Sequence, residues 1–319
     1  MKPNLPKIIV IVGPTASGKS DLAIKLAQKF NGEIISADSR QVYRGLDIGT
    51  GKVSKREQKL IPHHLIDITD PKRQFSVASW KKLAEKAIEK IISGSDPKRI
   101  ENPRFRNRAS LGRNRDKLPI VCGGTGLYID ALIYDLNLPK VPPNKKIRAE
   151  LEKQTTEQLF ETLQKLDPRR AAVIDHHNKV RLIRAIEIAR TLGQVPELDT
   201  DYSSLKPKYD VLWLGLNPKN LDERISIRLK KRLKQGMLAE IKKLRRSGVS
   251  WKRLDDLGLE YRWTARYLKG EITKSEMETG LLTDIRRYAK RQMTWFKRNK
   301  NIHWLDSPEK ATTLVLRGL

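Results

Sequence analysis

The sequence predicts an α/β fold: a parallel sheet around a phosphate-binding loop (P-loop), with an all-helical domain inserted into this core. Short apolar runs alternate with amphipathic helical patterns in the first part of the chain, and another apolar run follows the insertion. The stretch "GPTASGKS" (13–20) stands between the first apolar run and the first helical pattern, and it matches G-x-x-x-x-G-K-[ST]. The chain has no run of eighteen apolar residues, which excludes a membrane span.

The first part of the chain alternates strand and helix patterns. The strand patterns are short apolar runs, typical of buried parallel strands: "KIIVIV" (7–12), "EIISA" (33–37) and "PIVC" (119–122). The helical pattern after the P-loop places Leu22, Leu26 and Phe30 on one face. A second helix is expected at 76–93, with Ser76 as its N-cap. This alternation predicts a doubly wound parallel sheet.

A proline-rich stretch near residue 139, "LPKVPPN", marks the expected start of the inserted domain. We place this helical domain at 140–204, with helices at 144–166 and 177–192. Residues 1–139 and 205–319 are expected to form the catalytic core with its basic C-terminal helices. The patterns of its second part are a strand at 210–216, helices at 221–246 and 274–298, and a strand at 302–305.

The segment 95–117 fits neither pattern. It contains eight Lys or Arg residues against three acidic residues, two prolines and almost no apolar side chains. We therefore expect a disordered, basic surface loop between a helix and its strand, which could add electrostatic affinity for RNA.

The charge balance points to a polyanionic partner. The chain carries 65 Lys and Arg against 37 Asp and Glu, a formal net charge of +28, and nucleic acid is the usual partner of such a surface. The alternative is a proteome that is basic throughout. Cys122 is the single cysteine, so no disulfide framework can form and a cytoplasmic location is expected. A buried structural role is favoured for Cys122 over a catalytic one.

The P-loop explains how a diphosphate would be held. Its glycines let successive backbone N–H groups point at phosphate oxygens, and the following helix adds its positive end. Lys19 supplies a charge, and the Ser20 hydroxyl can ligate Mg²⁺. The expected diphosphate-binding residues are Gly13, Pro14, Thr15, Ala16, Ser17, Gly18, Lys19 and Ser20.

The P-loop alone does not distinguish between several activities. A triphosphate hydrolase needs a metal-holding acid after an apolar strand, but no acidic pair follows Asp67 in "HHLID", and no N-K-x-D motif occurs. Two alternatives stay open. One is a kinase for a nucleotide or small metabolite, with ATP in the loop; the other is a basic RNA-binding factor without catalysis.

Six motifs together resemble the tRNA dimethylallyltransferase (tRNA isopentenyltransferase) family, in its bacterial type. They occur in the order of that family and extend from near residue 8 to about residue 305. They are "GPTASGKS" (13–20), "DSRQVYRGLDIGTGK" (38–52), "PHHLID" (62–67), "GGTGLYI" (123–129), "RLIRAIEI" (181–188) and "AKRQMTWF" (289–296).

The resemblance implies an activity, a cofactor and partners. In this family the P-loop holds dimethylallyl diphosphate, and the dimethylallyl group moves to N6 of the adenosine at position 37 of tRNA, next to the anticodon, releasing diphosphate. The implied cofactor is Mg²⁺, and the implied partners are dimethylallyl diphosphate and the tRNA anticodon stem-loop. The family leans towards monomers, so a monomer is expected.

The resemblance also assigns catalytic residues. Asp38 matches the family's general base, Thr125 in "GGTG" matches a threonine near the transferred group, and Arg228 matches an arginine that stabilises the diphosphate. Arg224 lies one turn before Arg228 on the same helical face. The structural alternatives are a turn or N-cap aspartate for Asp38 and a solvated basic helix for Arg228.

Three segments match tRNA-contacting positions of the family. They comprise Asp38, Ser39, Arg40 and Gln41, then Val180, Arg181, Leu182, Ile183 and Arg184, and finally Gly258, Leu259, Glu260 and Tyr261. The last segment departs from the family's glycine-tyrosine-x-glutamate order. Basic helices at 221–246 and 286–298 would add contacts that release counterions from RNA.

Two further patterns receive structural interpretations. Trp295 and Phe296 could stack on bases, but core packing of an amphipathic helix is favoured. His63 and His64 could suggest a metal pair, but adjacent side chains of an extended segment point in opposite directions. A metal site at these histidines is therefore not expected.

Overall fold

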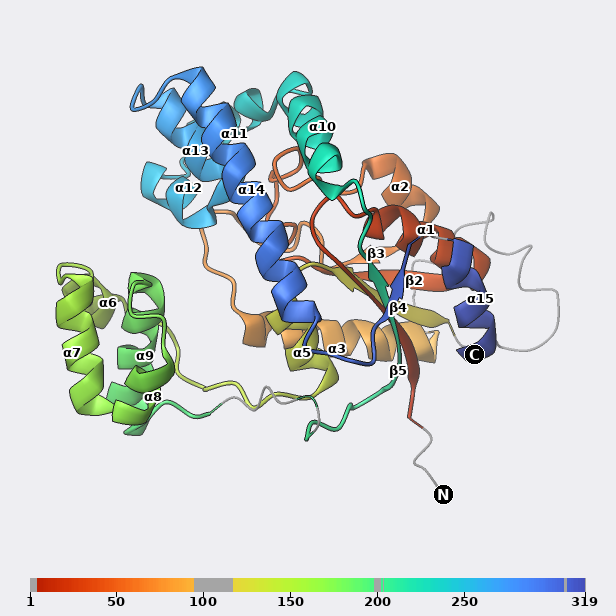
Figure 1. Ribbon diagram of the computed structural model, residues 1–319, viewed down its shortest axis with the longest axis horizontal. Coiled ribbons are helices and arrows are strands. Elements are labelled where there is room, and N and C mark those ends of the chain that lie inside the picture. Colours follow the sequence, from red (N-terminus) through yellow and green to blue (C-terminus); the bar gives the residue numbers. More distant parts are fainter. Residues whose placement is uncertain (1–4, 95–116, 198–201, 203, 307–308, 319) are drawn as a thin grey trace. The chain divides into compact units, whose positions relative to one another are not determined.

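The computed structural model describes residues 5–94, 117–197, 202, 204–306 and 309–318 (Figure 1). The chain divides into two compact units, Met1–Asp135 with Tyr202–Leu319, and Leu136–Asp201. Of the loop expected at 95–117, only Lys117 belongs to the described residues, so that prediction stays untested. None of the helices in the described ranges is both long enough and apolar enough to cross a bilayer.

Six parallel strands form the sheet of the larger unit, in the order β3-β2-β4-β1-β5-β6. They are β1 (Lys7–Val12), β2 (Gly32–Ala37), β3 (His63–His64), β4 (Leu118–Gly123), β5 (Asp210–Leu216) and β6 (His303–Leu305). Central β1 pairs with both neighbours through Ile9, which lies opposite Ile120 of β4 and Leu212 of β5. Every residue of β2 and β4 is buried, as expected for strands with helices on both faces. The predicted α/β fold is confirmed.

Helices cover both faces of this sheet (Figure 1). On one face, α1 (Lys19–Lys29) and α15 (Glu309–Gly318) share an apolar cluster with alternate residues of the strands. On the other face lie α3 (Val77–Ser93) and α5 (Gly126–Ile133). Trp80 of α3 is fully buried and donates its indole N–H to the Ser36 carbonyl at 3.0 Å. This bond anchors α3 beside the carboxyl end of β2.

The C-terminal part of the larger unit is a group of helices. They are α10 (Leu221–Lys234), α11 (Met237–Arg246), α12 (Trp251–Leu257), α13 (Leu259–Leu268) and α14 (Lys274–Phe296). The single helix expected at 221–246 is wrong, because Gly236 adopts a φ of 97° and divides it into α10 and α11. The helix expected at 274–298 corresponds to α14, which packs against α13 and α10.

The smaller unit, Leu136–Asp201, is all-helical and has its own core. Its helices are α6 (Lys145–Leu151), α7 (Thr156–Leu166), α8 (Pro168–Val173) and α9 (Lys179–Leu192). The continuous helix expected at 144–166 is wrong, because Thr155 and Gln158 form a capping box that starts α7 anew. Glu187 is completely buried in this unit, where it accepts two hydrogen bonds from Arg148 at 3.0 and 2.7 Å.

Six of the described elements of the larger unit were not predicted: the helices α5, α12, α13 and α15, and two shorter elements, α2 and β3. Helix α2 (Lys55–Leu60) buries none of its residues, so it shows no amphipathic pattern, although Ser54 and Glu57 form a capping box. Strand β3 contains two histidines and no apolar residue. Strand β3 forms an edge of the sheet, on the side of β2 away from β1 and the P-loop. Lys55, Glu57 and Gln58 of α2 line a cavity beside the P-loop.

Candidate active site

The P-loop connects the carboxyl end of β1 to the start of α1. Gly13 has a φ of 142°, and a Cβ atom built on it would lie 2.4 Å from the Leu216 carbonyl oxygen of β5. Only glycine allows the loop to leave the sheet this closely. Gly18 has a φ of 97° and serves as the N-cap residue of α1. The loop therefore presents its backbone at the positive end of α1, the arrangement that binds phosphate groups.

Lys19 lies folded against the P-loop. Its Nζ donates to the Pro14 carbonyl at 2.6 Å and to Ser17 Oγ at 3.4 Å. The pKa of Lys19 is lowered to about 8, chiefly by burial and also by the charge of Arg228, while Cys122 and Asp38 act in the opposite direction. An anion beside this ammonium would stabilise its charged form.

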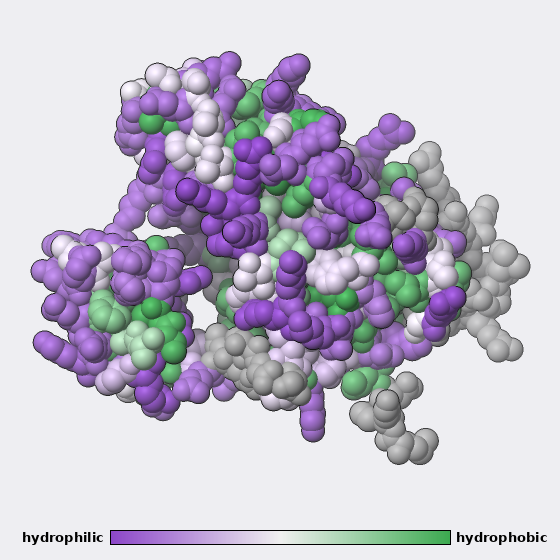
Figure 2. Space-filling view, viewed as in Figure 1, coloured by the Kyte–Doolittle hydropathy of each residue, from purple (hydrophilic) through white to green (hydrophobic). Residues whose placement is uncertain are grey.

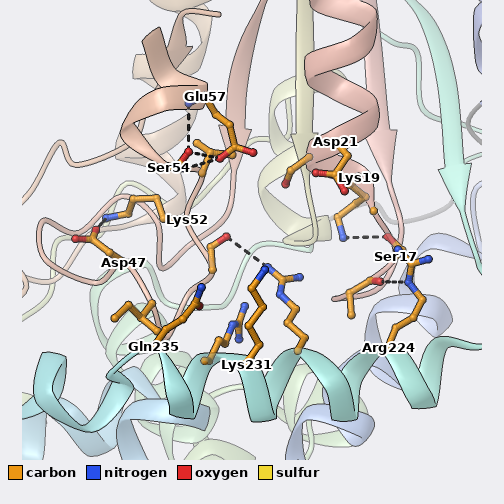
Figure 3. Close-up of a pocket in the computed structure, with 18 of the residues that line it drawn as sticks. Ser17, Lys19, Asp21, Asp47, Lys52, Ser54, Glu57, Arg224, Lys231 and Gln235 are labelled. Atoms are coloured by element: carbon orange, nitrogen blue, oxygen red, sulfur yellow. Dashed lines mark hydrogen bonds and ion pairs between the residues drawn. The ribbon is translucent and has the colours of Figure 1, made fainter. Parts of the chain in front are cut away.

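A cavity of about 940 Å³ opens beside the P-loop (Figure 3). The residues that line it come from the P-loop and the start of α1 (16–21), from the segment 47–58, and from α10. Three arginines and Lys231 of α10 reach this cavity. Such a concentration of positive charge around a phosphate-binding loop favours a polyanionic ligand.

Two arginines of α10 are held in place by backbone oxygens. Arg224 donates its Nε to the Ala16 carbonyl at 2.9 Å, and Arg228 donates Nη2 to the Gly51 carbonyl at 3.4 Å. Burial lowers the pKa of Arg228 to about 10, and the neighbouring Arg232 contributes to this shift. Arg228 is half-buried in the cavity, which argues against the alternative of a fully solvated basic helix.

Asp38 follows the last residue of β2, at the carboxyl edge of the sheet. Its Oδ1 accepts hydrogen bonds from the backbone N–H groups of Arg40 at 2.8 Å and Gln41 at 3.3 Å. The turn role considered as an alternative is therefore present. Within the described part of the chain, no hydrogen bond reaches Oδ2 of Asp38. One oxygen fixes the turn and leaves the other free for a ligand.

Thr125 is connected to the turn that begins at Asp38. Its Oγ1 accepts a hydrogen bond from the Ser39 N–H at 3.1 Å, and its own N–H donates to the Ala37 carbonyl at 3.2 Å. Strands β2 and β4 pair in register up to Ala37 and Gly123, which brings both turns to the same edge of the sheet. Neither Asp38 nor Thr125 lines the cavity itself.

The predicted tRNA-contacting residues of the larger unit come together through Arg40. Its Nε donates to the Leu257 carbonyl at 2.7 Å, directly before Gly258. Glu260 is buried and forms an ion pair with Arg232 at 2.7 Å; its pKa is raised, chiefly by burial. Tyr261 is also buried, and its hydroxyl donates to Glu240 Oε1 at 3.0 Å.

The remaining predicted segment, 180–184, lies on α9 of the smaller unit. Val180 and Arg181 are exposed, whereas the side chains of Leu182 and Ile183 belong to the core of that unit. Arg184 is half-buried, pairs with Glu187 and donates to the Val141 carbonyl at 2.8 Å. Val180 and Arg181 therefore present the exposed side chains of this segment, with Arg181 paired to Asp175 at 3.8 Å.

The donor set of the cavity suits a magnesium ion that is carried by a phosphate ligand. Among the described residues, no group of three or more His, Cys, Asp or Glu side chains could hold a metal by itself. The Ser20 hydroxyl and the Asp21 carboxylate both line the cavity and are hard oxygen donors. Mg²⁺ commonly binds one or two such protein groups together with substrate phosphates, so these residues fit it.

The chain matches two family models and many known proteins. The model described as "IPP transferase" matches residues 41–98 and 103–299, and the model described as "Isopentenyl transferase" matches residues 6–68. The chain belongs to the IPP transferase family. A tRNA dimethylallyltransferase of Alkaliphilus oremlandii is 39% identical, with 98% of this chain and 96% of that protein covered. A tRNA dimethylallyltransferase 1 of Geotalea uraniireducens is 40% identical, with 97% of both covered.

Solved structures of this IPP transferase family share the fold. The tRNA isopentenylpyrophosphate transferase of Bacillus halodurans is 34% identical, with a TM-score of 0.65 over 98% of this chain and 96% of that one. A eukaryotic dimethylallyltransferase acting on tRNA is 28% identical, with a TM-score of 0.72 over 98% of this chain and 78% of that one. The predicted family is confirmed.

Two residues of this IPP transferase that hold the site together were given no role by sequence reasoning. Glu240 of α11 accepts the backbone N–H groups of Asp47, Ile48 and Gly49 at 3.0, 2.6 and 3.1 Å. Gln292 of α14 contacts both the P-loop and the "GGTG" turn. Gln292 lies within the quoted motif "AKRQMTWF", and this motif could have pointed to it. No local pattern in the sequence points to Glu240.

The structure places three further residue groups of the sequence analysis; Trp295 is only half-buried, whereas Phe296 packs in the core as favoured. Cys122 is buried on β4, and burial raises the pKa of its thiol to about 12. Phe296 is buried in the core, and Trp295 donates its indole N–H to Asp130 at 2.8 Å. The two histidines of β3 have different partners, because His63 contacts the Ile61 carbonyl and His64 contacts Glu33, each at 2.8 Å.

Proposed function

We propose that the chain is a tRNA dimethylallyltransferase that uses the cavity beside the P-loop for its donor. It moves the dimethylallyl group from dimethylallyl diphosphate to N6 of adenosine 37, next to the anticodon. The carbon–oxygen bond to diphosphate breaks, a carbon–nitrogen bond to N6 forms, and N6 gives up one proton. The observation that carries this proposal is the cationic cavity of a P-loop in a chain whose relatives are named tRNA dimethylallyltransferases.

On the donor side, the proposed diphosphate site is the P-loop, residues 13–20. Its backbone N–H groups and the positive end of α1 neutralise the diphosphate as it departs, and Lys19 and Arg228 add charge at the same cavity. Mg²⁺ would be held by Ser20 and Asp21 with phosphate oxygens, and it would stabilise the leaving charge.

On the acceptor side, Asp38 is the proposed general base. The adenine N6 amine is a poor nucleophile because its lone pair is delocalised into the ring, and a carboxylate that accepts its proton helps the attack. The Oδ1 bonds to Arg40 and Gln41 orient the carboxylate, which leaves Oδ2 to face the amine. Thr125 holds the same turn through Ser39 and is proposed to contact the substrate near the transferred group.

For tRNA, we propose that exposed basic side chains attract the phosphate backbone of the RNA. The turn 38–41 and the segment that begins at Gly258 then read the anticodon loop. In the space-filling view, hydrophilic residues cover much of the face over α10, α11 and α14 (Figure 2). Arg181 on α9 and the turn 38–41 supply further contacts. Because Glu260 and Tyr261 are buried with protein partners, their proposed part is to support the segment that begins at Gly258. The protein is proposed to act as a monomer in the cytoplasm.

A transfer assay tests this proposal. Labelled dimethylallyl diphosphate is incubated with the protein, Mg²⁺ and unmodified tRNA, and parallel reactions contain ATP and candidate acceptors or tRNA whose adenosine 37 is replaced by guanosine. Label should enter the unmodified tRNA alone. Phosphate transfer from ATP would instead support a kinase, and tRNA binding without either transfer would support an RNA-binding factor.

A further inference from the structure

Gln292 forms a bridge between the donor side and the acceptor side of the site. Its Oε1 accepts the backbone N–H of Thr15 in the P-loop at 2.8 Å, and its Nε2 donates to the Gly124 carbonyl at 2.9 Å. The side chain is buried, so both ends of the amide are satisfied by the protein and neither bond competes with bulk water.

The bridge depends on a very close approach of α14 to the "GGTG" turn. A Cβ atom on Gly124 would lie 2.1 Å from Gln292 Nε2, and a Cβ atom on Gly126 would lie 2.1 Å from Cδ1 of Trp295. Gln292 and Trp295 are three residues apart and therefore lie on one face of α14. Two glycines of the turn thus admit two neighbouring side chains of the same helix.

From Gly124 the hydrogen-bonded path continues to the proposed base. Thr125 follows Gly124, its Oγ1 accepts the Ser39 N–H at 3.1 Å, and Ser39 follows Asp38. The path thus runs from Thr15 through Gln292 and the "GGTG" turn to Asp38. Every contact along it is a hydrogen bond or a peptide linkage, so a displacement at one end changes the position of the other.

We propose that Gln292 is a positioning residue for prenyl transfer: it sets the distance between the diphosphate held by the P-loop and the carboxylate of Asp38. This inference rests on the proposed function. Transfer requires the reacting carbon and nitrogen to approach within about 3.5 Å in line, and misplacement by about 1 Å costs roughly 100-fold in rate. Gln292 contacts neither substrate in this proposal, so it acts on the chemical step and leaves each substrate's own contacts in place.

The test compares Gln292→Met, which keeps the length and removes both hydrogen bonds, with Gln292→Glu, which keeps an acceptor for the Thr15 N–H. The control is Thr294→Ala, an exposed position on the same helix. We expect kcat of Gln292→Met to fall about 10- to 100-fold, with each KM within about threefold of the wild type, and Gln292→Glu to recover part of the loss. Thr294→Ala should match the wild type.

Thermal unfolding of each variant separates positioning from folding. A Gln292→Met protein that is folded and keeps the wild-type kcat overturns the inference, as does a loss of activity in both variants that matches their loss of folded protein. If Gln292→Met does not fold, the test depends on the kcat of folded Gln292→Glu. A kcat equal to that of the wild type overturns the inference. A wild-type protein without any prenyl transfer would refute the proposed function instead.

Discussion

At the scale of single residues, Asp38 uses its two carboxylate oxygens differently. Oδ1 accepts two backbone hydrogen bonds that shape the turn after β2, and Oδ2 receives none from the described residues. Asparagine can replace Asp38 without unfolding the turn, because its side-chain oxygen also accepts hydrogen bonds from the backbone. The two duties can therefore be tested separately.

Asp38→Asn should keep the turn and remove the base. We expect kcat to fall by about 10²- to 10⁴-fold, the usual contribution of a general base, with tRNA affinity close to that of the wild type. The control is Asp70→Asn, another turn aspartate, whose Oδ1 accepts the Lys72 N–H at 2.7 Å. Single-turnover kinetics and tRNA binding measure both effects. An equal loss of tRNA affinity in Asp38→Asn would make Asp38 a recognition residue.

The lowered pKa of Lys19 predicts how donor binding depends on pH. Burial brings this pKa to about 8, so the ammonium loses its proton as the pH rises through that value. Diphosphate binds the charged form, and the affinity for the donor should therefore fall above pH 8, by up to about tenfold per pH unit. Lys19→Arg keeps its charge at higher pH and should flatten the profile. Calorimetric titration at several pH values measures this, and a flat wild-type profile would contradict the prediction.

At the scale of elements, the segment 47–51 forms the wall of the cavity opposite the P-loop. Glu240 holds the N–H groups of Asp47, Ile48 and Gly49, and Arg228 holds the Gly51 carbonyl. Three successive N–H groups form a nest for an anion, and here the anion is a side chain of α11. The shape of this wall thus depends on α10 and α11 rather than on the segment itself.

Glu240→Ala should loosen this wall. Its removal leaves three N–H groups and the Tyr261 hydroxyl without their acceptor, so we expect the free energy of unfolding to fall by about 2 kcal/mol. KM for the donor should rise as well, since Gly51 helps to place Arg228. Glu278→Ala serves as the control: this residue is half-exposed on α14, with a weak ion pair to Lys274 at 3.9 Å, and the effect should stay below about 0.5 kcal/mol. Denaturant unfolding checks both values, and a Glu240→Ala protein as stable as the control would refute the prediction.

The elements show which structure could be predicted from sequence and which could not. The strand patterns at 7–12 and 210–216 correspond to β1 and β5, since buried parallel strands are apolar along most of their length. Short β3 lacks such a run. Gly236, which divides α10 from α11, was visible in the sequence but was not used. Gln292 contacts Thr15 across 277 residues of chain, and no local pattern reports a contact of that range.

As with the fold, part of the candidate site was predicted from the sequence and part was not. The P-loop was found from its local motif, Asp38 and Arg228 were assigned through the resemblance to the family, and the structure gathers the P-loop and Arg228 at one cavity. Their assigned roles stay predictions. The burial of Glu260 and Tyr261 was not foreseen, because burial depends on which distant side chains, such as Arg232 and Glu240, complete their hydrogen bonds.

At the scale of the whole molecule, the net charge of +28 bears on tRNA affinity. Each phosphate contact from a lysine or arginine releases counterions, so the logarithm of the affinity falls linearly with the logarithm of salt concentration, by about 0.7 to 0.9 per contact. Lys290 and Arg291 are exposed on α14, on the hydrophilic face of the C-terminal helices. These two side chains are available for such contacts.

Reversing both charges, as Lys290→Glu with Arg291→Glu, should therefore weaken tRNA binding and reduce the salt slope by about 1 to 2. The donor affinity should not change, because neither residue lines the cavity. The control, Lys25→Glu with Lys29→Glu, alters the net charge equally on exposed positions of α1, which packs against the sheet. Filter binding over a salt series measures both slopes. If the two double variants lose the same affinity and the same slope, the attraction comes from total charge, and α14 makes no contacts of its own.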